Sequence, residues 1–185
     1  PAKAPVTVQN ILDYVEAKFY DGLIFHRVIP NFMIQCGGMD AEMRQKSGNP
    51  AIKNEAGNGL KNTRGSVAMA RTNVVDSATS QFFINLKDND FLDHAGVSPS
   101  TFGYAVFGQV VDGMNVVDAI GAKKTRGADG MFKDLPVEAI VIKDVKVRVK
   151  FAPLPDVTVP INELRLKNVG SDSDKGVLVA DLTGV

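Results

Sequence analysis

Short apolar runs, separated by Gly, Asn, Asp and Pro, are the feature that most limits what this sequence can fold into. The runs have the length of β-strands, and most are too short to form helices. Two helical patterns accompany them, but these do not alternate with the strands as the helices of a doubly wound α/β sheet do. The pattern therefore favours a mainly β protein, an antiparallel barrel or sandwich with helices at its ends. We predict strands at 24–29, 32–35, 66–70, 81–86, 105–111 and 140–149.

The first helical pattern covers Thr7–Phe19, where apolar residues recur at helical spacing. Thr7 is the expected N-cap residue, and the Asp21-Gly22 pair is a turn signal that is expected to end the helix. A second, shorter helix is predicted at Met114–Ile120, because glycines flank this apolar run on both sides.

Residues 151–185 differ from the chain before them. Residues 151–155 form a linker interrupted by prolines, and two strand-like runs follow at 163–169 and 176–182. The Gly, Ser and Asp residues between these runs are typical of a turn, so a hairpin is predicted. We therefore divide the chain into a β domain at 1–150 and a linker with a C-terminal hairpin.

The charge balance excludes partners that bind through net charge alone. The chain has 185 residues, and its 21 Lys and Arg residues balance its 21 Asp and Glu residues. A chain without net charge has no strong field with which to attract nucleic acid or an anionic membrane. No apolar run approaches the roughly 20 residues of a membrane-spanning helix. We therefore expect neither nucleic acid nor membrane as a partner.

The single cysteine, Cys36, fits a reducing compartment, because no disulfide can form within the chain. No signal peptide is recognisable ahead of the first helical pattern. We therefore expect a cytoplasmic location, with the periplasm, after processing, as the alternative.

Residues that could bind a metal or act as a nucleophile do not form a recognisable site. The spacing of His26, Cys36 and His94 matches no zinc motif. The sequence contains no phosphate-binding glycine loop and no Gly-x-Ser-x-Gly turn. Cys36 lies in an apolar run, where a packed thiol is more common than a reactive one. We therefore expect neither metal nor cofactor.

Two predicted strand regions, 25–35 and 80–85, mix bulky apolar residues with uncharged polar ones and one arginine. Because alternate residues of a strand share a face, the polar residues point the same way as bulky apolar ones. Such a face makes a poor core but a suitable groove for a peptide, since buried polar groups need partners. The alternative is a set of edge residues with local hydrogen bonds. The residues concerned are Arg27, Met33, Gln35, Gln81 and Phe83.

These residues stand in motifs that resemble those of the cyclophilin family of peptidyl-prolyl cis-trans isomerases. The motifs are FHRVIPNFMIQ at 25–35, AMAR at 68–71 and SQFFI at 80–84. NEA at 54–56, GLKNTRG at 59–65 and DNDFLD at 88–93 are similar to the bacterial branch, and the likeness spans residues 3–149. The resemblance implies a closed eight-stranded antiparallel β-barrel capped by two α-helices.

The resemblance also implies the residues of the active groove, of which Arg27 matches the catalytic arginine of the family. The expected activity is peptidyl-prolyl cis-trans isomerisation in protein folding, with proline-containing peptides and unfolded proteins as substrates. The alternative is a module that holds proline segments without turnover. The substrate-binding positions are matched by Phe32, Met33, Gln35, Ala70, Arg71, Gln81, Phe83, Phe91, Leu92 and Tyr104.

Three departures from the family pattern carry expectations of their own. Phe91 replaces a tryptophan whose indole N–H binds cyclosporin in the family, so weak binding of cyclosporin is expected. Cys36 replaces a glycine, and it would disturb the local strand if the backbone shape of glycine is required there. The family also has two strands before the KAPVTV stretch, which here begins at Lys3.

The C-terminal hairpin would supply these two strands, as in a circular permutant, because a barrel that lacks two strands exposes open edges. We therefore expect residues 151–185 to complete the barrel and the protein to be a monomer. The alternatives are an unrelated extension and a hairpin donated to a neighbouring chain.

Overall fold

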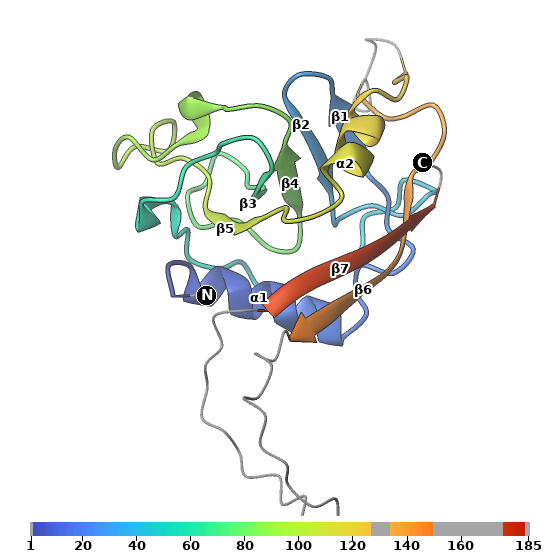
Figure 1. Ribbon diagram of the computed structural model, residues 1–185. Coiled ribbons are helices and arrows are strands. Elements are labelled where there is room, and N and C mark those ends of the chain that lie inside the picture. Colours follow the sequence, from blue (N-terminus) through green and yellow to red (C-terminus); the bar gives the residue numbers. More distant parts are fainter. Residues whose placement is uncertain (1, 127–133, 150–175, 184–185) are drawn as a thin grey trace, which may run out of the picture.

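Two antiparallel sheets and two α-helices make up the part of the chain that the computed structural model describes, residues 2–126, 134–149 and 176–183 (Figure 1). Helix α1 spans Pro5–Glu16 and α2 spans Met114–Gly121, and neither is long and apolar enough to cross a membrane. Short 3-10 helices lie at Ala56–Asn58 and Asp90–Leu92. The strands are β1 (Arg27–Ile29), β2 (Met33–Cys36), β3 (Ser66–Met69), β4 (Phe82–Asn85), β5 (Val106–Gln109), β6 (Val141–Val149) and β7 (Gly176–Thr183).

The larger sheet has five strands in the order β1-β2-β4-β3-β5, each antiparallel to its neighbours. Each of its strands overlaps a region that the sequence predicts to be a strand. Four are shorter than predicted, and β2 is shifted by one residue, so that it ends at Cys36. Residues 24–26 fall outside β1 because their backbone groups bond elsewhere. The N–H of Ile24 donates to the carbonyl of Met39, and that of Phe25 donates to the carbonyl of Ile140.

Helix α1 begins earlier than the sequence predicts. Ala4 is the N-cap residue and Pro5 takes the first helical turn, where a missing N–H leaves no bond unmade. Thr7 is therefore not the N-cap; it is buried, and its hydroxyl donates to Glu55 Oε2 at 2.7 Å. The Glu55 carboxylate also accepts the backbone N–H groups of Val6 and Thr7. A distant acidic side chain thus satisfies the free donors of the first turn.

Strands β6 and β7 form the second sheet, and they pair from Val141 with Thr183 to Val149 with Gly176. β6 contacts α1, and Figure 1 shows β7 alongside β6. β6 also bonds to the segment before β1, since the N–H of Ile142 donates to the carbonyl of Leu23 at 2.8 Å. Among the described residues the partner of β7 is therefore the last strand of the 1–150 region. The hairpin partner predicted at 163–169 lies outside the described residues.

The described strands do not close into the expected eight-stranded barrel. They form an open five-stranded sheet, with β1 and β5 at its edges, and a separate two-stranded sheet. β6 meets the segment before β1 through an isolated bridge between Ile24 and Val141 and a few neighbouring hydrogen bonds, not through a ladder with β1. What the structure supports is a mainly β fold with two helices.

The five-stranded sheet separates two apolar clusters. Ile34 and Cys36 of β2 point into the main core, where they meet residues of both helices such as Ile11 and Ile120. Met33 of β2 points the other way, because successive residues of a strand face opposite sides. It belongs to a smaller cluster, which forms the floor of the site described next and consists of Met33, Ala68, Phe83, Leu92 and Val106.

Candidate active site

A cavity of about 210 Å³ opens over this smaller cluster. Its lining comes from β1, β2 and β4, the end of β3, the second 3-10 helix and the residues before β5. Of the residues that the resemblance assigns to the groove, only Gln81 and Phe91 are absent from the lining. The cavity brings together Arg27, Phe32, Met33, Gln35, Ala70, Arg71, Phe83, Leu92 and Tyr104.

The register of the sheet explains why these distant residues meet. Arg27 of β1 pairs with Gln35 of β2, and Gln35 pairs with Phe83 of β4. Directly paired residues of antiparallel strands point to the same face, so one row of side chains crosses three strands. Met33 shares this face because it lies two residues from Gln35. The alternation predicted for Arg27, Met33, Gln35 and Phe83 is therefore present in the structure.

The floor of the cavity is apolar and closely packed. Met33, Phe83 and Leu92 are 2%, 4% and 8% exposed. The ring of Tyr104 meets that of Phe83 edge-on, with 5.7 Å between ring centroids, a favourable aromatic geometry. Phe32 packs against the same cluster from the side. Such a floor can hold a small apolar ring.

Arg27 stands at the rim of the cavity, where its side chain is 45% exposed. Its Nε donates to Asp134 Oδ2 at 3.3 Å. No described residue accepts a hydrogen bond from Nη1 or Nη2, so that edge of the guanidinium is free to meet a ligand. Sequence reasoning missed Asp134, because it follows Arg27 by 107 residues and lies in a polar stretch without a motif.

Gln81 does not line the cavity, but it holds the side chain of Gln35, which does. The side chain of Gln35 donates from Nε2 to Gln81 Oε1 at 2.8 Å, which leaves the oxygen of Gln35 available as an acceptor. The close approach of Gly38 permits this arrangement, since a Cβ at that residue would lie 2.5 Å from Gln81 Nε2.

Phe91 lies outside the cavity lining and is 70% exposed. Its ring stacks on that of Phe32, with 5.6 Å between centroids and 24° between planes. The residue therefore extends the apolar rim of the groove but carries no hydrogen-bond donor on its ring.

A buried network of three asparagines fixes the wall of the cavity. Asn62, Asn85 and Asn89 are each at most 1% exposed. Asn85 Nδ2 donates to Asn62 Oδ1 at 3.2 Å, and Asn89 Nδ2 donates to Asn85 Oδ1 at 2.7 Å. The network then reaches two cavity residues, because Asn89 donates to the carbonyl of Phe32 and Asn62 to that of Leu92. The GLKNTRG and DNDFLD motifs contain Asn62 and Asn89, and Asn85 ends the predicted strand region 80–85, but the sequence did not predict the contacts among them.

Burial favours the neutral form of His26, next to Arg27, and of Cys36, which faces the main core. Burial lowers the pKa of His26, and the positive charge of Arg27 adds to this effect. Burial raises the pKa of the Cys36 thiol, as expected for a packed rather than a reactive cysteine. Cys36 is the last residue of β2 and still pairs with Phe82, so the strand forms with a cysteine at this position.

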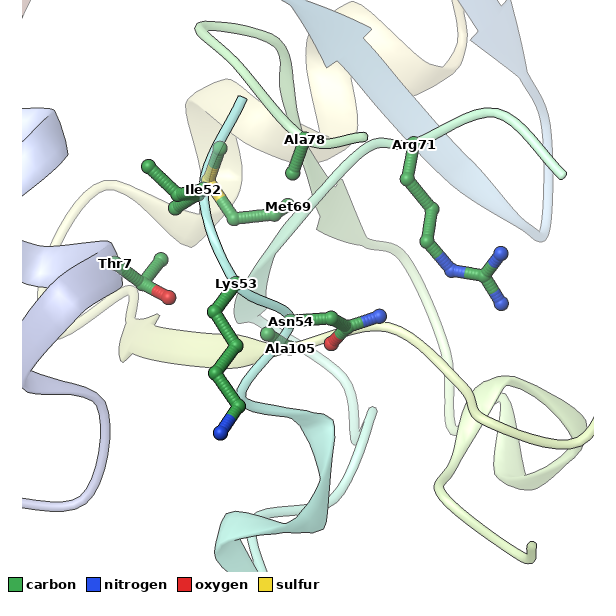
Figure 2. Close-up of a pocket in the computed structure, with 8 residues that line it drawn as sticks. All are labelled: Thr7, Ile52, Lys53, Asn54, Met69, Arg71, Ala78 and Ala105. Atoms are coloured by element: carbon green, nitrogen blue, oxygen red, sulfur yellow. The ribbon is translucent and has the colours of Figure 1, made fainter. Parts of the chain in front are cut away.

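A second hollow lies between α1 and the end of β3 (Figure 2), and it has no room for a water molecule. Arg71 borders both hollows, and Figure 2 shows its guanidinium directed away from Ile52, Met69 and Ala78. The second hollow is therefore a packing gap, and the cavity beside Arg27 is the candidate binding site.

Comparison with known proteins identifies the family of the chain. The family model for cyclophilin type peptidyl-prolyl cis-trans isomerases matches residues 1–147. Peptidyl-prolyl cis-trans isomerase B of Escherichia coli (strain K12) is 57% identical over 145 residues, covering 78% of this chain and 88% of that protein. Peptidyl-prolyl cis-trans isomerase A of Dickeya dadantii is 55% identical, covering 78% and 74%.

A solved structure gives the same result. The crystal structure of a Cryptosporidium parvum cyclophilin type peptidyl-prolyl cis-trans isomerase, in the presence of the dipeptide Ala-Pro, has a TM-score of 0.64 to this chain. The two are 25% identical, and the match covers 77% of this chain and 85% of that one. The chain therefore belongs to the cyclophilin-type peptidyl-prolyl cis-trans isomerases. It is an isomerase of X–Pro bonds, which confirms the family and activity that the motifs imply.

Proposed function

We propose that the cavity beside Arg27 holds the X–Pro bond during isomerisation, and that Arg27 is the catalytic residue. One observation carries the proposal. The register of β1, β2 and β4 sets the free edge of the Arg27 guanidinium beside the apolar floor of Met33 and Phe83. A hydrogen-bond donor next to a pocket for an apolar ring is what a twisting prolyl amide requires.

The chemistry of the peptide bond explains this requirement. Resonance gives the amide partial double-bond character, and rotation crosses a barrier of about 18–20 kcal/mol. Without a catalyst an X–Pro bond takes on the order of tens to hundreds of seconds to isomerise. Rotation removes the resonance, so the prolyl nitrogen gains a lone pair that can accept a hydrogen bond. A guanidinium N–H stabilises this twisted state more than the planar one, which lowers the barrier.

The remaining residues of the cavity hold the substrate while the bond turns. The proline ring rests on the apolar floor of Met33, Phe83 and Leu92, and the preceding carbonyl group rotates. Gln35 binds a polar group of the peptide through its free oxygen, and the backbone at Ala70 runs along the substrate. A reaction that only rotates a bond needs no nucleophile and no covalent intermediate.

Replacement of Arg27 tests the assignment. Arg27→Ala is expected to lower kcat/KM for an X–Pro peptide at least about tenfold, roughly 1.4 kcal/mol of transition-state stabilisation, in a protease-coupled assay. Arg44→Ala is the matched control, because Arg44 is also exposed and paired with an acidic residue, Asp40, but does not line the cavity. Unchanged turnover in a folded Arg27→Ala protein would overturn the role of Arg27.

We also propose that the C-terminal residues complete the barrel of their own chain. β7 supports this idea, because it already adds a strand along the length of β6. A closed barrel leaves no open strand edge, which would explain why the tail carries strand-like runs.

We further propose that the protein works as a cytoplasmic monomer on proline-containing segments of unfolded proteins. Its single cysteine is buried, which fits a reducing compartment. Cyclosporin is expected to bind weakly, since the exposed ring of Phe91 offers no N–H donor. Cell fractionation and a size measurement in solution test the location and the oligomeric state.

A further inference from the structure

We propose that Arg71 gives the groove a preference for peptides that carry an acidic side chain two or three residues from the proline. The proposal rests on the groove function proposed above and names a class of substrate for it. Arg71 lines the same cavity as Arg27, and the lining contains no other charged residue. Both charges are positive, so the cavity attracts anionic groups.

The hydrogen bonds of Arg71 hold its side chain without neutralising it. Nε donates to the carbonyl of Gly103 at 3.0 Å, Nη1 to that of Thr72 at 2.9 Å, and Nη2 to that of Pro99 at 2.8 Å. These acceptors are neutral, and no ion pair among the described residues includes Arg71. Because an arginine has about five N–H donors, roughly two remain for a ligand.

Aromatic contacts keep this charge at the wall of the groove. The guanidinium lies over the ring of Tyr104, 4.8 Å from its centroid, and Tyr104 in turn packs edge-on against Phe83 of the floor. Figure 2 shows the Arg71 side chain extended away from the neighbouring core residues. The guanidinium is therefore preorganised, so a carboxylate that binds it does not have to order a flexible side chain.

Arg71 is also separated from the reacting bond. β1 and β3 lie three strand spacings apart in the sheet, roughly 14 Å. The register places Arg27 level with Ala68, and Arg71 follows Ala68 by three residues, so the backbones at Arg27 and Arg71 are roughly 17 Å apart. An extended peptide advances about 3.3 Å per residue. With the reach of the side chains added, an acidic residue two or three positions from the proline meets Arg71. Arg27 is already paired with Asp134, so Arg71 is the stronger site for a carboxylate.

Matched peptide pairs test the proposal. Each pair contains one proline and carries Glu or Gln at one position two or three residues before or after it. In the unaltered protein, we expect kcat/KM for the Glu peptide to exceed that for the Gln peptide roughly two- to fivefold at one or more of these positions. A ratio of this size is what one partly exposed ion pair between the Glu side chain and Arg71 would contribute. The ratio should shrink toward one in about 0.5 M salt, because salt screens such a pair.

Variants then assign the preference to a residue. Arg71→Gln should bring the Glu-to-Gln ratio to about one, and Arg71→Lys, which keeps the charge, should retain part of it. Lys124→Gln is the control and should leave the ratio unchanged, because Lys124 is exposed and does not line the cavity. If Arg71→Gln merely disturbed the local structure, kcat/KM would fall by the same factor for both peptides of a pair. The Glu-to-Gln ratio therefore separates charge recognition from structural damage.

Two results would overturn the preference: a ratio of one at every position in the unaltered protein, or a ratio that survives Arg71→Gln. A different result would overturn the groove function itself, namely no isomerisation of any Gln peptide by the unaltered protein.

Discussion

Burial of His26 beside Arg27 makes the stability of the fold depend on pH. The folded protein binds a proton at this imidazole less readily than the unfolded chain, whose histidine has the ordinary pKa of 6.5. The unfolded state therefore takes up more protons as the pH falls through 6.5 toward the lower folded pKa, and folding becomes less favourable. Well above pH 6.5 the imidazole is neutral in both states and has no such effect.

A His26→Gln protein isolates this contribution. Between about pH 7.5 and 5.5, the free energy of unfolding is expected to fall by up to about 1 kcal/mol more in the unaltered protein than in the variant. Urea denaturation at both pH values measures the difference. Asp93 and Asp118 do not interfere, because their pKa values lie below 3.8. Equal pH dependence of the two proteins would contradict the account of His26.

At the groove rim, Phe91→Trp is expected to tighten cyclosporin binding. The indole adds a donor and apolar area at an exposed position that already stacks on Phe32. One satisfied hydrogen bond contributes about 0.5–1.5 kcal/mol, or roughly two- to tenfold in Kd. Titration calorimetry of both proteins measures the change. If the unaltered protein already binds as tightly as Phe91→Trp, residue 91 does not explain the affinity.

Most of the residues that line the cavity could be predicted from the sequence, because strand parity and motifs place them directly. Arg27, Gln35 and Phe83 share a face once their strands are paired in register. Asp134 could not be predicted in the same way. Its contact with Arg27 depends on how a loop distant in sequence folds over β1, and no periodic pattern encodes that.

At the scale of elements, the asparagine network ties the end of β4 to the cavity wall. Asn85→Leu removes the donor to Asn62 and the acceptor for Asn89 in a region without access to water. Each buried polar group left without its partner costs about 1–3 kcal/mol. We expect the free energy of unfolding to fall by about 2–5 kcal/mol in urea denaturation.

Asn73→Leu is the matched control, because Asn73 is exposed and lies outside the network. Surface changes of this kind usually alter stability by no more than about 0.5 kcal/mol. If Asn85→Leu and Asn73→Leu had the same free energy of unfolding, the hydrogen bonds of the network would contribute nothing to stability that an apolar side chain could not replace.

Helix α1 shows why element boundaries were harder to predict than elements. The apolar spacing identified the helix, but Thr7 was wrongly taken as its cap. A capping side chain can come from any part of the fold, and here Glu55 satisfies the free N–H groups of the first turn. Local sequence does not contain that information.

At the scale of the whole molecule, the tail decides how the sheets are completed. Deletion of residues 156–185 removes β7 and exposes the edge of β6 along its length. It also removes the apolar residues of 163–169 and 176–182, each worth about 1.5–3 kcal/mol if buried, against a total stability of about 5–15 kcal/mol. We expect the truncated chain to be unfolded or aggregated, as circular dichroism and light scattering would show.

The size of the full-length protein completes this test. A monomer fits a tail that completes its own barrel, whereas a dimer whose exchange depends on concentration would mean that the tail is donated to a neighbouring chain. A soluble, active 1–155 fragment with native-like melting would show that the tail is a dispensable extension. The sequence predicted a strand at 176–182 and a hairpin with 163–169, but not the pairing of β7 with β6, because pairing between distant segments depends on the register of the whole sheet.

Exchange NMR on an X–Pro peptide tests most directly whether Arg27 catalyses rotation or merely helps to hold proline. The account predicts that the unaltered protein speeds the interconversion of the cis and trans isomers of the peptide, which appears as exchange broadening of their NMR signals. Arg27→Ala should still bind the peptide through the apolar floor of Met33 and Phe83 but exchange the two isomers at least about tenfold more slowly. Exchange at the same rate in both proteins, with comparable binding, would contradict the central role of the guanidinium.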